Sequence, residues 1–234
     1  MIARRSLVLA DGAAPTRAGL DAAWPGWAEG IDLVVAADGG ARLAGPLGLS
    51  IDRWVGDGDS LGPEGVEALR VAGVPVELAS TDKEETDTEL GLLAAIAIGA
   101  AAVTILGALG GPRVDHELAN VQLLAHPAAA GVPVELLHDG IRIRLLSAPA
   151  ATMAAEAASV RLELAGRTGD VVSLIPLVDA AGVTTSGLRY PLSDAVLRVG
   201  PARGVSNVRD QSDAWVRIRS GRLLVAEVPA TLPE

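Results

Sequence analysis

The chain has 234 residues, half of them hydrophobic, which is enough for one large domain or two smaller ones. Its formal net charge of −10 argues against a bare nucleic-acid backbone or an anionic membrane surface as a partner. The absence of cysteine excludes disulfides, thiolate metal sites and a cysteine nucleophile, and is typical of a cytoplasmic protein. The N-terminal apolar run is too short for a signal peptide, and the most apolar helical segment is too short to cross a bilayer.

The first 140 residues alternate short apolar strands with helical segments. Helical periodicity is clear at residues 63–73 and 87–100, whereas two prolines interrupt residues 13–30. Wholly apolar strands that alternate with helices predict a mostly parallel sheet covered by helices on both faces. The expected strands are SLVLADG (6–12), DLVVAADGG (32–40), RWVGDGDS (53–60), VPVELAST (74–81), AVTILGALGG (102–111) and VPVELLHDG (132–140).

From residue 141 onward the pattern changes to short strands, several with period-two alternation, separated by turns rich in Gly, Pro, Asp and Ser. No helix of convincing length follows Ala158, and this predicts an all-β sandwich or barrel. We therefore expect an α/β domain over residues 1–140 and a β-sandwich domain over residues 141–234. The expected strands are IRIRLLSA (141–148), SVRLELAG (159–166), VVSLIPL (171–177), AVLRVG (195–200), AWVRIRSG (214–221) and RLLVAEVPA (222–230).

Acidic residues follow the expected strands of the first domain. Ligands bind at the carboxyl ends of parallel strands, so this topology should gather these acids on one edge of the sheet. A group of carboxylates needs a counter-charge, and hard oxygen ligands suit Mg²⁺. The alternative is that Asp and Gly are ordinary turn residues at strand ends. The acids are Asp38, Asp57, Asp59, Asp82, Asp87 and Asp115.

The segment WVGDGDSL (54–61) concentrates this signal, because two carboxylates lie between glycines directly behind a short apolar strand. The glycines would let two carboxylates approach one metal ion and let the backbone come close to a nucleotide. The chain has no G-x-x-x-x-G-K-[ST] motif, so a P-loop is excluded, and the spacing of GDGDSLG does not fit a dinucleotide fingerprint.

Seven segments, in order along the chain, resemble the thiamine pyrophosphokinase family. Each block alone is only moderately specific, whereas seven in the family's order, spanning most of the chain, are strongly specific. The blocks are AADGGARLA (36–44), VGDGDSL (55–61), STDKEETDTELGL (80–92), LGALGGPRVDHELANVQLL (106–124), VSLIPL (172–177), TSGLRYPL (185–192) and GVSNV (204–208).

The resemblance implies a homodimer in which an α/β domain binds ATP and Mg²⁺ and a β-sandwich binds thiamine and forms the dimer. It implies transfer of the terminal pyrophosphoryl group of ATP to the hydroxyethyl oxygen of thiamine, giving thiamine diphosphate and AMP. Only the resemblance, and not the composition, points to thiamine. It also assigns Asp57, Asp59 and Asp87 as Mg²⁺ ligands and, with Asp115, as the catalytic acids. The further residues that it places at ATP are Asp38, Gly39, Ser60, Thr81, Lys83, Thr86, Arg113, His116 and Asn120.

Two groups of these residues have alternative interpretations. Lys83, the only lysine of the chain, is either a compact positive charge near the phosphates or a solvated loop residue. Asp115 is placed to cap the helix that follows a Gly-rich turn, and His116 either binds a phosphate or packs at the domain edge. Pro112 is an extra residue relative to the family's pattern and could shift Arg113.

In the family, thiamine lies between the acidic edge of one subunit and the β-domain of the other. Tyr190, the only tyrosine, matches the ring that stacks on the cationic heterocycle, although core packing is an alternative. Ser206 and Asn207 would hydrogen-bond the pyrimidine, or are turn formers. A carboxylate must also accept the hydroxyl proton, and either Asp87 or Asp115 could do so.

Two other functions are compatible with parts of this pattern. A related pyrophosphokinase acting on a hydroxymethyl pterin would share the acids and Mg²⁺, but the blocks around Tyr190 and Asn207 belong to the thiamine type. A catalytically silent nucleotide- or thiamine-binding protein would need fewer acids than the chain retains. Release of AMP distinguishes an active pyrophosphokinase from the silent binding protein.

Overall fold

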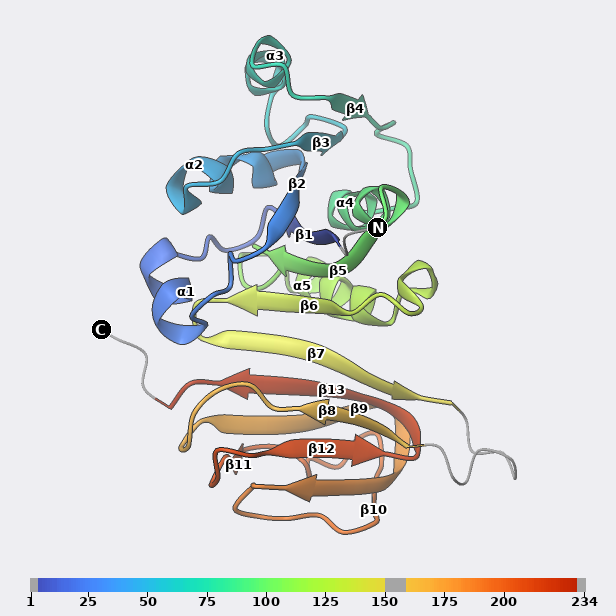
Figure 1. Ribbon diagram of the computed structural model, residues 1–234. Coiled ribbons are helices and arrows are strands. Elements are labelled where there is room, and N and C mark those ends of the chain that lie inside the picture. Colours follow the sequence, from blue (N-terminus) through green and yellow to red (C-terminus); the bar gives the residue numbers. More distant parts are fainter. Residues whose placement is uncertain (1–3, 150–158, 231–234) are drawn as a thin grey trace. The chain divides into compact units, whose positions relative to one another are not determined.

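The computed structural model describes residues 4–149 and 159–230 (Figure 1). The chain divides into two compact units, Met1–Asp139 and Gly140–Glu234, which we describe one at a time.

The first unit is built on a parallel sheet. Its strands lie in the order β4-β3-β2-β1-β5-β6, and every pairing between them is parallel. Val8 in the central strand lies opposite Val35 on one side and Ile105 on the other, so apolar residues adjoin one another across the three central strands. This confirms the predicted α/β architecture. The strands are β1 (Arg4–Leu9), β2 (Ile31–Ala37), β3 (Arg53–Gly56), β4 (Val76–Leu78), β5 (Ala100–Leu106) and β6 (Val134–His138).

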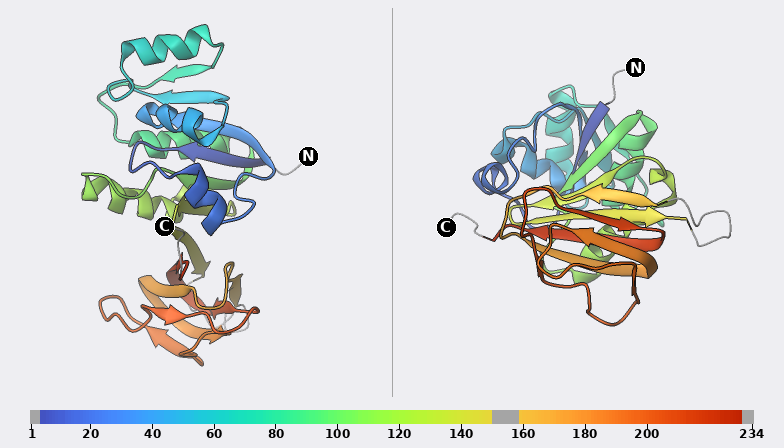
Figure 2. Two further views of the ribbon diagram at one scale, coloured as in Figure 1. Left: turned by 90° about the vertical axis from the view of Figure 1, so that its left-hand side faces the viewer. Right: turned by 60° about the horizontal axis from the view of Figure 1, so that its bottom comes forward.

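Successive strand residues point to opposite sides of this sheet, so both of its faces carry apolar side chains. Helices cover both faces. Leu7 and Leu9 pack in one cluster with Leu20 of α1. The left view of Figure 2 shows α1 in front of the strands. Val8 lies on the other face beneath α4, where a Cβ on Gly91 would meet its Cγ1 atom at 2.8 Å. The helices are α1 (Arg17–Ala23), α2 (Ala44–Leu47), α3 (Pro63–Val71), α4 (Asp87–Ala97) and α5 (Val114–Gln122), with the 3₁₀ helices η1 (Asp38–Leu43), η2 (Leu123–Ala125) and η3 (Pro127–Ala129).

The segment with two prolines forms one short helix. Thr16 caps α1 by accepting a hydrogen bond from the Gly19 amide at 2.9 Å, and the helix ends at Ala23, two residues before Pro25. A proline fits before the cap but cannot continue a helix, which explains why only seven residues of residues 13–30 are helical.

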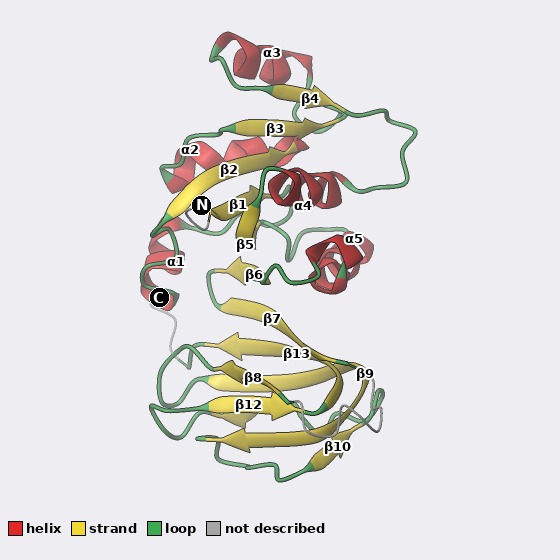
Figure 3. Ribbon diagram, turned by 45° about the vertical axis from the view of Figure 1, so that its right-hand side comes forward, coloured by secondary structure: helices red, strands yellow, loops and turns green. Residues whose placement is uncertain are grey.

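The second unit is an antiparallel β-sandwich, as predicted (Figure 3). The long strand β9 pairs with β13 along its first part and with β12 beyond Gly182, so it belongs to both layers. Between the layers lies an aliphatic core that includes Leu174, Val216 and Val225. The strands are β7 (Ile141–Ala148), β8 (Val160–Glu163), β9 (Val171–Ser186), β10 (Ala195–Leu197), β11 (Asn207–Val208), β12 (Trp215–Ile218) and β13 (Ser220–Val228).

None of the helices within residues 4–149 and 159–230 combines the length and the apolar character that crossing a bilayer requires.

Candidate active site

Asp38 begins the site at the carboxyl end of β2. Its side chain is 1% exposed, and its two oxygens accept the amide hydrogens of Ser60 at 3.0 Å and Leu61 at 3.1 Å. Burial raises the pKa of Asp38 above its usual value, and the two amide hydrogen bonds oppose that shift. Asp38 therefore anchors the turn that follows β3.

Gly56, the last residue of β3, lets this turn approach Asp38. Its φ of 154° lies in a region that side chains disfavour, and a Cβ would stand 2.8 Å from the Cβ of Asp38. Asp38 itself has a φ of 41°, and its carbonyl accepts a hydrogen bond from the Trp54 indole at 3.0 Å. The glycine before the paired acids is thus required by close packing as well as by the turn.

Three carboxylates converge at this point. Asp38, Asp57 and Asp59 each offer an oxygen, and these atoms all lie within 4.8 Å of one another. One oxygen of Asp57 accepts the Asp59 amide hydrogen at 3.1 Å, which keeps the turn tight. Asp38 is buried, Asp57 is half-buried and Asp59 is exposed, so the cluster opens toward solvent on the side of Asp59. Its hard oxygen donors fit a divalent cation such as Mg²⁺.

Lys83 joins Asp87 to this cluster. Its ammonium nitrogen lies 2.6 Å from Asp57 Oδ2 and 3.1 Å from Asp87 Oδ1. The hydrogen bond from Lys83 lowers the pKa of Asp57, whereas burial raises the pKa of Asp87 against the effect of the same lysine. For Lys83 burial lowers the pKa, but the hydrogen bonds that its ammonium donates to the two carboxylates prevail and the net shift is upward. The predicted ligands Asp57, Asp59 and Asp87 are thus neighbours, although the tightest oxygen cluster contains Asp38 in place of Asp87.

Of the other residues expected at ATP in this part of the chain, three make contacts within the protein and one is exposed to solvent. Thr86 caps α4 by accepting the Glu89 amide hydrogen at 3.2 Å, and the Ser60 hydroxyl lies 3.2 Å from Asp59 Oδ1. Gly39 is buried against the Asp11 carboxylate, which occupies the place that a side chain would need. Thr81 is exposed in the loop before α4.

The residues at α5 are arranged differently from the expectation. Asp115 does not cap this helix, because the helix begins at Val114 and its N-cap residue is Arg113, which makes no side-chain cap. Instead the carboxylate of Asp115 binds the Arg113 guanidinium through two hydrogen bonds, of 2.9 and 2.6 Å, and this pair lowers the pKa of Asp115. His116 is exposed, whereas Asn120 is buried and donates to the Ala108 carbonyl at 2.9 Å. Asn120 therefore holds the loop after β5.

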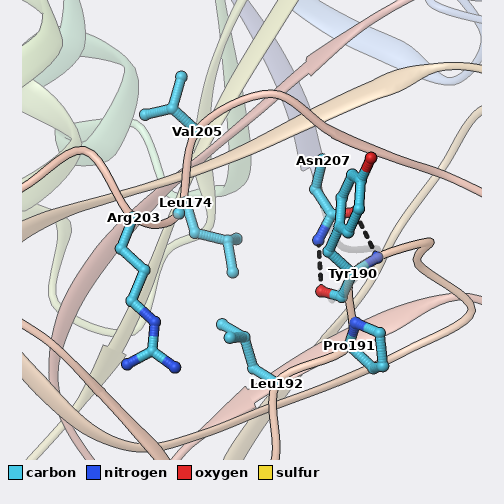
Figure 4. Close-up of a pocket in the computed structure, with 8 residues that line it drawn as sticks. Leu174, Tyr190, Pro191, Leu192, Arg203, Val205 and Asn207 are labelled. Carbon is cyan, nitrogen blue, oxygen red and sulfur yellow. Dashed lines mark hydrogen bonds between the residues drawn. The ribbon is translucent and has the colours of Figure 1, made fainter.

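Two of the predicted thiamine residues, Tyr190 and Asn207, line a pocket of about 210 Å³ in the second unit (Figure 4). Asn207 is buried, accepts the Tyr190 amide hydrogen at 3.0 Å and donates to the Tyr190 carbonyl at 2.7 Å. These bonds fix the backbone of Tyr190, whose side chain is 65% exposed, so the alternative of core packing is wrong for this residue. Ser206 is exposed and has a φ of 59°. The pocket is lined by Leu174, Tyr190, Pro191, Leu192, Arg203, Gly204, Val205 and Asn207.

Sequence reasoning missed three charged residues near these sites. Arg42 donates to the Ser60 carbonyl at 2.9 Å and pairs with Asp11 at 3.3 Å, so it ties the turn after β3 to the end of β1. The position of Asp11 behind an apolar strand was a signal that could have identified it. Arg203 lines the pocket beside Tyr190, and no feature of its local sequence separates it from other exposed arginines.

Two family models match the chain in succession. The model described as thiamin pyrophosphokinase, catalytic domain, matches residues 27–136, and the one described as thiamin pyrophosphokinase, vitamin B1 binding domain, matches residues 159–223. Over 201 residues, the chain is 24% identical to the thiamine pyrophosphokinase of Bacillus subtilis, covering 86% of this chain and 89% of that protein.

Solved structures of thiamin pyrophosphokinases share the fold of this chain. The crystal structure of the Bacillus subtilis thiamine pyrophosphokinase matches with a TM-score of 0.78 and 23% identity, covering 97% of this chain and 99% of that one. The thiamin pyrophosphokinase of Candida albicans matches with a TM-score of 0.73 and 16% identity, covering 96% of this chain and 90% of that one. The α/β unit followed by a β-sandwich is therefore the architecture of these proteins.

Proposed function

The chain belongs to the thiamin pyrophosphokinase family, and we propose that it transfers the pyrophosphoryl group of ATP to thiamine, releasing AMP and thiamine diphosphate. The observation that carries the proposal is the group formed by Asp38, Asp57, Asp59 and Lys83 at the carboxyl ends of parallel strands. A parallel sheet binds its ligands at this edge, and phosphoryl chemistry needs a positioned metal and a positive charge there.

We assign Asp57, Asp59 and Asp87 to holding Mg²⁺, with Asp38 as a further candidate because its oxygen lies in the same cluster. When bound, Mg²⁺ would bind phosphate oxygens and offset the charge that develops on them. Lys83 would supply a second positive charge to the phosphates. Asp38 also positions the turn through Ser60 and Leu61, so its substitution should disturb the site indirectly.

The reaction also removes a proton from the thiamine hydroxyl when its oxygen attacks the β-phosphorus and AMP leaves. Asp115 is a weak base, because its ion pair with Arg113 lowers its pKa. Asp87 therefore remains our candidate for accepting this proton. His116, which is exposed at the start of α5, is free to meet an anion, whereas Asn120 contributes through the loop that it holds.

We assign the pocket at Tyr190 to thiamine. An exposed aromatic ring can stack on a cationic heterocycle, an attraction worth roughly 0.5–2 kcal/mol. Asn207 would act mainly as a positioning residue, because its amide is engaged with the backbone of Tyr190. The Ser206 hydroxyl is exposed and could bind the pyrimidine.

The family pattern further supports a homodimer in which each active site combines the acids of one subunit with Tyr190 of the other. The use of ATP supports a cytoplasmic location. Both points rest on the family and on the chemistry of the reaction.

The metal assignment is tested with Asp59→Asn, which removes the exposed carboxylate without changing its size. We expect turnover to fall at least about a hundredfold, because a misplaced metal loses the electrostatic stabilisation of the transition state, and losing one preorganised contribution of this kind typically costs about that much. Binding of Mn²⁺, measured by electron paramagnetic resonance, should weaken in parallel. Full turnover by a folded Asp59→Asn variant would refute the assignment. Asp32→Asn is a suitable control, since Asp32 lies in β2 but outside the cluster.

A further inference from the structure

Lys83 lies where a cation bound to the acidic cluster would compete with it. It is the only lysine in the chain, and its side chain is 13% exposed. Its ammonium contacts Asp57, which is a member of the cluster, and also Asp87 at the start of α4. The sequence thus provides one compact, strongly hydrated charge on a flexible stem and the fold brings it to the acids.

Both oxygens of Asp57 are already engaged in this arrangement. Oδ1 accepts the Asp59 amide hydrogen at 3.1 Å, and Oδ2 accepts the Lys83 ammonium at 2.6 Å. Two positive charges cannot share Oδ2 at that distance without strong repulsion. A divalent cation that uses this oxygen must therefore displace the ammonium from Asp57.

After displacement from Asp57 the ammonium keeps only Asp87, which the proposed metal site also uses, and the Lys83 side chain is only 13% exposed, so a further anion would stabilise it. The polyphosphate of a nucleotide provides such an anion. Lys83 belongs to the loop between β4 and α4, which connects the edge of the sheet to the helix carrying Asp87. The same side chain can thus neutralise the carboxylates before the metal arrives and the phosphates afterwards.

We propose that Lys83 is a tethered counter-ion that the metal displaces from Asp57, so that binding of the metal and of a polyphosphate favour each other. This inference rests on the proposed function for the identity of the ligands. It concerns binding alone, so it can fail or succeed independently of any transfer to thiamine. By linkage, whatever the polyphosphate adds to metal affinity the metal must add to polyphosphate affinity.

The first experiment measures Mn²⁺ binding without nucleotide, by electron paramagnetic resonance, for the full chain and for Lys83→Met and Lys83→Arg. Loss of one neighbouring positive charge should tighten Mn²⁺ binding about tenfold in Lys83→Met, whereas Lys83→Arg should resemble the original chain. Arg53→Met is the matched control, because Arg53 lies in β3 but pairs with Glu77 outside the cluster, and it should change the affinity little. Unchanged or weaker Mn²⁺ binding by Lys83→Met would overturn the proposal.

The second experiment needs no substitution and therefore stands even if Lys83→Met does not fold. Reductive methylation with ¹³C-formaldehyde labels only Lys83 and the N-terminal amine, and it preserves the positive charge. Saturating Mg²⁺ should shift the dimethyl-lysine resonance, and inorganic tripolyphosphate added afterwards should shift it again. A resonance that Mg²⁺ leaves unchanged would overturn the displacement. If these shifts occur in a protein that forms no AMP with thiamine, the inference stands and the proposed function fails.

Discussion

Arg203 carries a positive charge at the edge of a pocket that we assign to a positively charged substrate. It is exposed and, among the described residues, has neither an ion-pair nor a hydrogen-bond partner. Tyr190 and the apolar residues Leu174 and Leu192 supply attraction in the same pocket. If thiamine binds here, its stacking on Tyr190 and its packing against the leucines must therefore outweigh its repulsion by the Arg203 guanidinium.

We expect Arg203→Met to lower the KM for thiamine roughly twofold, because a like charge at the edge of the pocket, in a water-like dielectric, contributes roughly 0.5 kcal/mol of repulsion. Steady-state kinetics at low and high salt will check this, since screening should reduce the difference. Arg198→Met removes an equal charge from an exposed position outside the pocket and should leave the KM unchanged. A higher KM in Arg203→Met would mean that the guanidinium binds the substrate directly.

Between the strands β7 and β13, an ion pair is buried in the sandwich. Glu227 is 2% exposed, and one of its oxygens lies 2.6 Å from the Arg144 guanidinium. Burial raises the pKa of Glu227 above its usual value of 4.5, and Arg144 opposes the shift without cancelling it. The ionised form of Glu227 is thus less stable in the folded protein than in the unfolded chain, where water surrounds it.

This shift has a definite sign in the dependence of stability on pH. Because the folded pKa exceeds the unfolded one, the favourable contribution is complete below about pH 4.5 and is lost as the pH rises through the folded pKa. We therefore expect the unfolding free energy of the original chain, relative to Glu227→Gln, to increase as the pH falls from 7 toward 4.5. Urea unfolding at several pH values measures this difference. A relative stability that does not change with pH would contradict the shift.

At the level of elements, local sequence patterns were sufficient where an apolar run or a helical period continues through most of a strand or helix. The apolar strands β1, β2 and β5 and the helices α3 and α4 were predicted within a few residues. The two-residue strand β11 was not, because its pairing with β9 depends on residues far away in the chain. The 3₁₀ helix η1, which begins at Asp38, was not predicted, and the strand expected over residues 32–40 ran into its first three residues.

The site could be predicted in its residue types and only partly in its contacts. The positions of Asp57, Asp59 and Lys83 in the sequence suggested a charged edge, and the structure brings them together. The inclusion of Asp38 and the pairing of Arg113 with Asp115 depend on turn geometry and side-chain conformation. Such features are decided by tertiary contacts that no local pattern contains.

At the scale of the whole molecule, the proposed dimer predicts complementation between two inactive variants. The Asp59→Asn variant should lose metal binding at the acidic cluster, and the Tyr190→Ala variant should lose thiamine binding at the pocket. If each site combines Asp59 of one subunit with Tyr190 of the other, every mixed dimer contains one intact site. Random mixing should then restore about a quarter of the original activity.

The measurement is turnover after the two variants are unfolded together and refolded, with each variant refolded alone as the control. Sedimentation should show a dimer throughout. Activity no greater than the sum of the two separate variants would show that each subunit uses its own Tyr190, or none.

The most direct test of the account is a product assay with the purified chain, ATP, Mg²⁺ and thiamine, with a hydroxymethyl pterin in a parallel reaction. Chromatography then resolves the nucleotides and the acceptors. We predict AMP and thiamine diphosphate in equal amounts, and no AMP with the pterin. AMP formed only with the pterin would agree with the acidic site but show that thiamine is not the substrate. No AMP with either acceptor would contradict the proposed function.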